Sequence, residues 1–175
     1  MADANKLEVW LRGPLDGIMP TLQPVAHALL QAREELNELV HGFPAVRLWE
    51  RPAGVASVGF HLQHLRGVLD RLFTYAKGSV LSDEQLQALT NEGKMDPALT
   101  PEGLVVLFNE QVDKALAQLK EASAEELTRP RGVGRQQLPS TVMGLYVHAA
   151  EHTMRHVGQL HVTVKIVRAK ITVAS

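Results

Sequence analysis

Four long segments of this chain place apolar residues three and four positions apart, and proline or glycine lies between the segments. They span residues 21–41, 55–76, 100–122 and 140–167. Residues at that spacing share one face of an α-helix, and an apolar face is stable only when it is buried against a neighbouring element. Four amphipathic helices of roughly 20 residues each therefore predict an all-α protein, an up-down four-helix bundle with one or two short extra helices.

Local signals mark where two of the helices begin. Ser82 and Gln85 form a capping-box pattern, which predicts a short helix over residues 83–89. Thr100 followed by Pro101 predicts the start of the third long helix. Threonine is a good N-cap residue, and proline is favoured at the first helical position.

Two segments are predicted as loops. Residues 90–99 are polar, and residues 129–139 contain two prolines and two glycines. We expect at most a short extended piece in the second loop, at 136–138. The last helix ends in the β-branched run VTVKIV, which leaves its C-terminal boundary open because β-branched residues have lower helix propensity.

Composition excludes several classes of function. The 175 residues suit a single domain over 1–175, long enough to bury a core without disulfides. Cysteine is absent, which excludes Cys-based metal sites and cysteine nucleophiles and suits a reducing cytosol. The net charge of −1 gives no case for a nucleic-acid partner. No apolar run has the length of a membrane span or signal peptide, so we expect a cytoplasmic protein with no membrane partner.

Histidines are concentrated in the last predicted helix, which contains four of the eight. His148, His152 and His156 are each four residues apart, so their imidazoles lie one helical turn apart. On a helical wheel, His152 and His156 fall in the middle of the apolar stripe and His148 falls on its edge. Two such imidazoles are either hydrogen-bonded core histidines or ligands of one divalent metal ion. A metal site is our hypothesis.

A site with two histidine ligands needs a third from another helix. The second predicted helix offers His61 and His64. A wheel places His61 about 60° from the centre of that helix's apolar stripe and His64 about 120° away, which slightly favours His61. Spacing alone leaves the choice open.

Two motifs resemble those of the DinB-like metal-binding superfamily. They are S-x6-H-L and H-x3-H-x3-H-x-G-Q, formed here by Ser57, His64 and Leu65 and by His148, His152, His156, Gly158 and Gln159. The resemblance implies a four-helix bundle, often a homodimer, in which three histidines hold a divalent metal. Carried over by position, the implied ligands are His64, His152 and His156, whereas His61 and His148 match positions that are not the usual ligands. Val157 departs from the family pattern, in which arginine often precedes the Gly-Gln pair.

Three histidine ligands leave coordination positions open, which is the pattern of catalytic metal sites. An all-nitrogen set suits Zn²⁺, Ni²⁺, Fe²⁺ or Co²⁺. The resemblance implies thiol S-transfer or hydrolysis of a small-molecule substrate. The alternative is a non-catalytic metal-binding dimer with a regulatory or stress role. A homodimer is also expected from the apolar tail at 162–173.

No general base stands out in the sequence. Glu151 lies on the face of its helix opposite His152 and His156, and Asp70 lies far from the flank that carries His64. Glu50 and Glu110 are candidates that no sequence pattern supports. Gln159 lies near the apolar stripe, one turn beyond His156, and is a candidate hydrogen-bond partner of a ligand or of a bound water.

Overall fold

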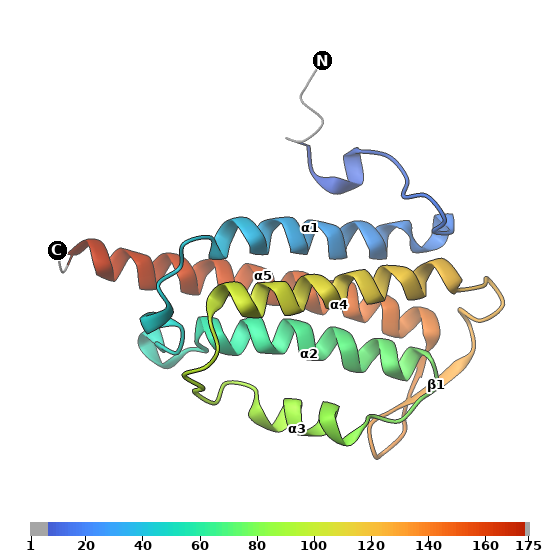
Figure 1. Ribbon diagram of the computed structural model, residues 1–175. Coiled ribbons are helices and arrows are strands. Elements are labelled where there is room, and N and C mark those ends of the chain that lie inside the picture. The colour runs from blue at the N-terminus through green and yellow to red at the C-terminus, as the bar shows by residue number, and fades with distance from the viewer. Residues whose placement is uncertain (1–6, 174–175) are drawn as a thin grey trace.

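The computed structural model describes residues 7–173, and four long helices form its body (Figure 1). They are α1 (Gln23–Val40), α2 (Val58–Ala76), α4 (Pro101–Glu121) and α5 (Val142–Val173). A shorter helix, α3 (Asp83–Asn91), lies outside the bundle, alongside α2. The large, fully buried core side chains include Leu22, Leu29, Leu36, Leu62, Leu65, Leu69, Phe108, Leu119 and Leu160. The predicted all-α bundle with a short extra helix is confirmed.

One detail differs from the prediction, because the four helices do not simply alternate in direction. The side-chain amide of Gln118, near the end of α4, donates hydrogen bonds to the carbonyl of Phe73 near the end of α2 and to the hydroxyl of Tyr146 near the start of α5. Thus α2 and α4 run parallel, and α5 returns antiparallel to both (Figure 1). The connection over residues 77–100 therefore runs back along the bundle and carries α3 with it.

The predicted helix starts agree with the structure to within a few residues. The capping box at Ser82 is present, and so is the N-cap hydrogen bond of Thr100. Ser57 caps α2, so this helix begins at Val58 and not at residue 55. α3 continues to Asn91, two residues beyond its predicted end.

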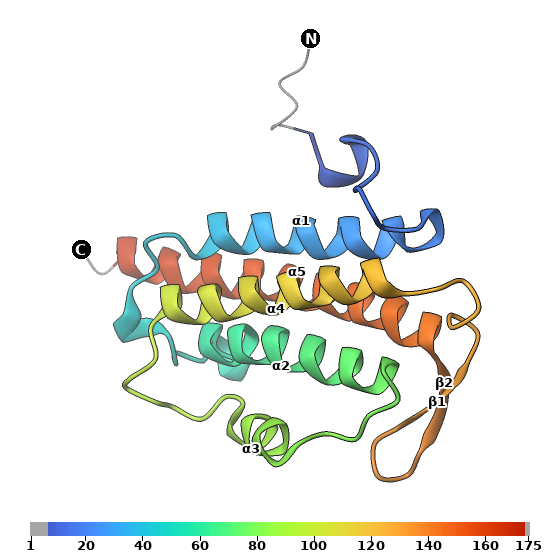
Figure 2. The same cartoon turned by 45° about the vertical axis from the view of Figure 1, so that its right-hand side comes forward.

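The segment predicted as a loop before the last helix is an antiparallel hairpin of β1 (Pro130–Val133) and β2 (Leu138–Thr141) (Figure 2). Its prolines and glycines hide the strand pattern, but a two-stranded hairpin has only edge strands, where proline is tolerated. The Nε of Arg131 donates a hydrogen bond to the carbonyl of Ala76, which ties the hairpin to the end of α2.

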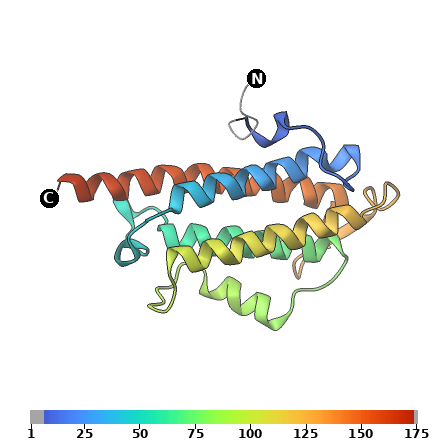
Figure 3. The same ribbon diagram turned by 45° about the horizontal axis from the view of Figure 1, so that its top comes forward.

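α5 follows the hairpin directly and is the longest helix of the described chain. It remains helical through its β-branched end, and its last turns extend past the other helices (Figure 3). It packs against both α1 and α2. Among the described residues, no helix combines the length and the apolar character that crossing a membrane requires.

Candidate metal centre

Three histidines from two helices meet between α2 and α5. The Nε2 atom of His64 lies 3.0 Å from the Nε2 atom of His152. The ring centroid of His156 lies 4.4 Å from that of His64 and 4.6 Å from that of His152. One ring nitrogen from each of the three lies within 4.8 Å of the others, so the group is compact enough to hold a single metal ion.

The position of this group on α5 differs from the position that the helical wheel predicted. His152 and His156 were expected in the middle of the buried face, but both are only partly buried. The centre is occupied by Thr153 and Val157, which are 0% and 1% exposed. The buried face is wider than the stripe because α5 packs against two helices. Each histidine precedes one of these core residues by one position and thus lies at the edge of the face, toward His64 on α2.

His61 is more deeply buried than His64 but does not join the group. It is 3% exposed, as the wheel favoured, and its Nδ1 lies 3.3 Å from the Nδ1 of His156. This contact engages the Nδ1 of His156, so we expect its Nε2 to be the atom that binds. The structure thus brings together His64, His152 and His156, with His61 packed behind His156.

Glu92 is a site residue that sequence reasoning missed. Its Oε2 accepts a hydrogen bond from the Nδ1 of His64 at 2.7 Å, and its Oε1 accepts one from Nη1 of Arg71 at 2.6 Å. The side chains of Glu92 and Arg71 are 8% and 10% exposed. Residue 92 lies in the segment predicted as a loop, and no local pattern marks it. It reaches His64 only because the α2–α4 connection runs back along α2.

The electrostatic setting keeps His61, His152 and His156 neutral. Burial, with His64 nearby, lowers the pKa of both His61 and His156 to about 4. Burial followed by the proximity of His64 also lowers the pKa of His152. Near neutral pH these imidazoles therefore carry lone pairs, which metal binding requires.

Glu92 is ionised in the same setting. Burial alone would raise the pKa of this carboxyl, but hydrogen bonds from His64 and Arg71 outweigh burial, so its pKa is lowered. An ionised carboxylate only accepts hydrogen bonds, so the proton of a neutral His64 lies on Nδ1 and the lone pair on Nε2.

These nitrogens fit a divalent metal ion. Facing lone pairs repel unless a proton or a cation lies between them. An ion about 2.1 Å from two nitrogens that are 3.0 Å apart would have them roughly 90° apart, an angle common in metal coordination. The Nδ1 of His152 is buried without a hydrogen-bond partner among the described residues.

His148 and Glu151 lie at the exposed edge of the group. The His148 ring centroid is 5.2 Å from that of His152, and its side chain is 52% exposed. Its Nδ1 lies 3.7 Å from one carboxylate oxygen of Glu151. The other carboxylate oxygen of Glu151 is paired with Arg155. His148 is therefore a neighbour of the group at its solvent side.

The remaining candidate residues lie away from the histidines. Glu50 is ion-paired with Arg47 and Lys170. Asp70 accepts a hydrogen bond from Gln85, while Glu110 and Gln159 are exposed to solvent. The suggested hydrogen bond from the Gln159 side chain to the site is not seen among the described residues.

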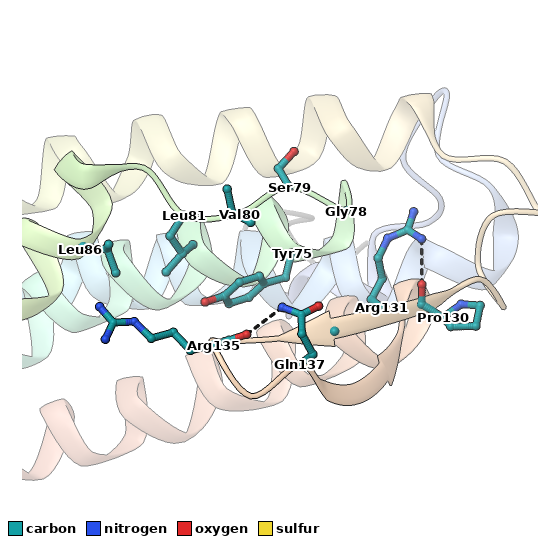
Figure 4. Close-up of a pocket in the computed structure, with 12 residues that line it drawn as sticks. Tyr75, Gly78, Ser79, Val80, Leu81, Leu86, Pro130, Arg131, Arg135 and Gln137 are labelled. Carbon is teal, nitrogen blue, oxygen red and sulfur yellow. Dashed lines mark hydrogen bonds between the residues drawn. The ribbon is translucent and has the colours of Figure 1, made fainter.

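A pocket of about 400 Å³ lies at the opposite end of α2 (Figure 4). It is formed by the turn after α2, by the start of α3 and by the hairpin, and Tyr75, Arg131 and Arg135 contribute to its lining. Tyr75 is eleven residues beyond His64 on the same helix, a distance of roughly 16 Å along the axis. No histidine lines this pocket, so it is separate from the histidine group.

A fold and a histidine group of this kind can be compared with known proteins. The family model of the DinB superfamily matches residues 28–160, well over half of the chain. The chain belongs to the DinB superfamily. No curated protein matches this DinB-superfamily chain.

Two solved structures share the fold. A conserved protein from Enterococcus faecalis superposes with a TM-score of 0.62 at 19% identity, over 86% of this chain and 99% of the other. A protein from Streptococcus pneumoniae superposes with a TM-score of 0.61 at 14% identity, over 85% of this chain and 90% of the other. At these identities the likeness shows the fold alone.

Proposed function

We propose that this DinB-superfamily protein is a metal-dependent enzyme that joins a low-molecular-weight thiol to a small electrophile. His64, His152 and His156 would bind one divalent ion through neutral imidazoles. The observation that carries the proposal is the close approach of their nitrogens across two helices, within 4.8 Å of one another. With three protein ligands, positions remain for a substrate, as in catalytic metal sites.

Activation of the nucleophile would come from a metal bound at the histidines. A divalent ion at these histidines would lower the pKa of a thiol or of a water molecule bound beside it. Phe60 holds the ring of His64 in place and shields one of its faces from water. The two rings are stacked, with centroids 5.3 Å apart and planes 9° apart. His64 is 16% exposed, so a small molecule can approach from the solvent side.

The carboxylates favour thiol transfer over hydrolysis. A hydrolase that activates water benefits from a free carboxylate or another base near the metal. The carboxylate beside the histidines, Glu92, is already bound to His64 and Arg71, and Glu151 is paired with Arg155 on the outer side. A thiol, with a pKa of about 8.5, needs far less help from a base than water does.

The proposed reaction is a displacement. The thiol loses its proton, its sulfur forms a bond to the electrophilic carbon, and the bond from that carbon to the leaving group breaks. The leaving group departs with the electron pair. The thiol proton passes to solvent at the exposed side of the histidine group, where His148 is 52% exposed.

A binding and turnover experiment tests the proposal. Purified protein is loaded with Zn²⁺, Ni²⁺ or Co²⁺, dialysed, and analysed for metal per chain. It is then assayed with cysteine or glutathione and a chromogenic alkyl halide. We expect one metal per chain and metal-dependent thiol consumption, both lost in His152→Ala and retained in His161→Ala, because His161 lies exposed on the same helix.

The other functions are distinct outcomes of this experiment. Metal-dependent cleavage of a chromogenic ester without thiol consumption would replace thiol transfer by hydrolysis. Stoichiometric metal with no turnover of either substrate class would favour a non-catalytic metal-binding protein. A protein that binds no metal under any loading condition would refute the proposal as a whole.

A further inference from the structure

We infer that Glu92, held by Arg71, is the positioning residue of the histidine group and prepares His64 to bind metal. This inference rests on the proposed metal site. The contacts are direct: one carboxylate oxygen of Glu92 accepts the Nδ1 hydrogen of His64, and the other accepts a hydrogen from Arg71. Both oxygens are thus used, and the ring of His64 is held with its Nε2 toward His152.

Burial of this ion pair points to a role beyond stability. The side chains of Glu92 and Arg71 are 8% and 10% exposed. Removing two charges from water is costly, and a buried ion pair contributes little net stability compared with apolar side chains of the same size. This buried ion pair also forms a hydrogen bond with His64, and an apolar pair of side chains could not form that hydrogen bond.

α2 has space for the carboxylate because of a glycine. A Cβ atom at Gly67 would lie 2.5 Å from Oε1 of Glu92 and 2.6 Å from Nη1 of Arg71. His64, Gly67 and Arg71 follow at spacings of three and four residues, so they share one face of α2. This face therefore provides the histidine, the space and the arginine together.

The backbone next to Glu92 is anchored to the same face. The Gly93 N–H donates to Oε1 of Gln63 at 2.7 Å. Gly93 has a φ of +79°, and a Cβ there would approach the Phe60 ring to 3.0 Å. The segment that carries Glu92 therefore contacts His64 through the carboxylate and lies against Phe60, which stacks on the same histidine.

The chemical consequence is a defined tautomer. A free neutral imidazole side chain favours the proton on Nε2, whereas the Glu92 carboxylate stabilises the proton on Nδ1. The lone pair is then on Nε2, the atom that faces His152. Such hydrogen bonds from metal-binding histidines to carboxylates orient the ring and raise the basicity of the ligand nitrogen.

The first test uses the metal-free protein and measures no activity. Nitrogen-15 NMR of the histidine rings reports which nitrogen carries the proton. We expect His64 to be the Nδ1–H tautomer in the wild type and to shift toward Nε2–H in Glu92→Ala. Glu92→Gln, whose amide oxygen can still accept the hydrogen, should retain Nδ1–H. An unchanged tautomer in Glu92→Ala would overturn the inference.

The second test measures Zn²⁺ affinity by competition with a chromophoric chelator. We expect Glu92→Ala to weaken binding roughly 10- to 100-fold and the isosteric Glu92→Gln to weaken it less. Glu102→Gln, at an exposed carboxylate on α4, is the matched control and should bind as the wild type does. Thermal unfolding of each metal-free variant separates affinity from folding.

The two tests distinguish a failed inference from a failed metal site. Unchanged Zn²⁺ affinity in both Glu92 variants, with a wild type that binds stoichiometrically, would refute the role of Glu92 and leave the proposed function intact. A wild type that binds no Zn²⁺ would refute the proposed function and this role with it. The NMR result would still show whether Glu92 sets the tautomer of His64.

Discussion

The Nε2 atoms of His64 and His152 lie 3.0 Å apart although the two residues are 88 positions apart in the chain. One belongs to the first half of α2 and the other to the first half of α5, so the contact exists only when the two helices are packed together. A metal ion at this point would connect the two helices directly. Metal binding and bundle stability should therefore be coupled.

The assignment of the ligands predicts a specific pattern of loss. Replacing His152 or His156 with alanine should abolish stoichiometric metal binding, because two imidazoles alone make a weak site. His148→Ala should have a much smaller effect, since His148 is half-exposed at the edge of the group. Elemental analysis after dialysis checks this prediction. Equal loss in His148→Ala would show that the ligand set is wrong.

Metal should also stabilise the folded protein. A ligand that binds only the native state adds about 2.7 kcal/mol to the free energy of unfolding at a concentration of 100 times its Kd. We expect Zn²⁺ to raise the melting temperature of the wild type and a chelator to reverse the rise. In His64→Ala, which removes the α2 ligand, scanning calorimetry should show almost no shift. A full shift in that variant would locate the metal elsewhere.

Acid should destabilise the metal-free protein in a defined window. The unfolded chain protonates His61 below its ordinary pKa of 6.5, whereas the folded protein does so only near 4. Between these values the unfolded state binds more protons, so the free energy of unfolding falls as the pH falls. The loss for this residue is at most about 1.4 kcal/mol per pH unit, and it is absent above 6.5.

Urea unfolding of the metal-free protein across this pH range measures the slope. His61→Asn removes the titrating group, so its slope should be smaller than that of the wild type. His156 and His152, whose pKa values are also lowered, should contribute to what remains. An undiminished slope in His61→Asn would show that other groups control the acid sensitivity.

The fold was predictable where its signals are local. Apolar stripes and caps such as Ser82 and Thr100 depend on neighbouring residues, so they located the helices to within a few positions. The direction of α4 depends on residues 77–100 running back along the bundle, which no local pattern encodes. The hairpin at 130–141 was incompletely predicted for a related reason, because its strands are rich in residues that usually mark loops.

The candidate site was predictable to a similar extent. The pairing of His152 with His156 follows from the helical period alone. The helical wheel ranked His61 above His64 because it places His61 nearer the centre of the buried face. In the structure this more buried position puts His61 behind His156. Choosing His64 needed the family resemblance, since the space between two helices cannot be inferred from one of them. Glu92 could not be predicted, because only the return of the chain along α2 brings it to His64.

A homodimer stays a prediction, and the outer side of α5 is its most suitable surface. Val147, Val162 and Ile166 are 50%, 58% and 42% exposed there. We expect sedimentation equilibrium to give twice the 19.2 kDa of the chain. Val162→Glu should favour the monomer, whereas Val106→Glu, at an exposed valine on α4, should not. A monomer at micromolar concentration in the wild type would contradict the prediction.

Gly67→Ala should separate metal affinity from stability. Alanine is the better helix former by about 1 kcal/mol, so the substitution by itself favours α2. Its Cβ would, however, lie 2.5 Å from Oε1 of Glu92 and 2.6 Å from Nη1 of Arg71. Both atoms are the ends of flexible side chains, so the pair can move aside at little cost to folding and would then release His64.

For this variant we expect a melting temperature of the metal-free protein equal to or above that of the wild type, together with Zn²⁺ affinity weakened by up to roughly 10-fold. Gly158→Ala is the matched control, because it is a helical glycine on α5 whose added Cβ meets no atom within 4 Å. It should gain the same helix propensity and keep full affinity. If Gly67→Ala binds Zn²⁺ as tightly as Gly158→Ala does, the space that Gly67 leaves for Glu92 has no part in metal binding.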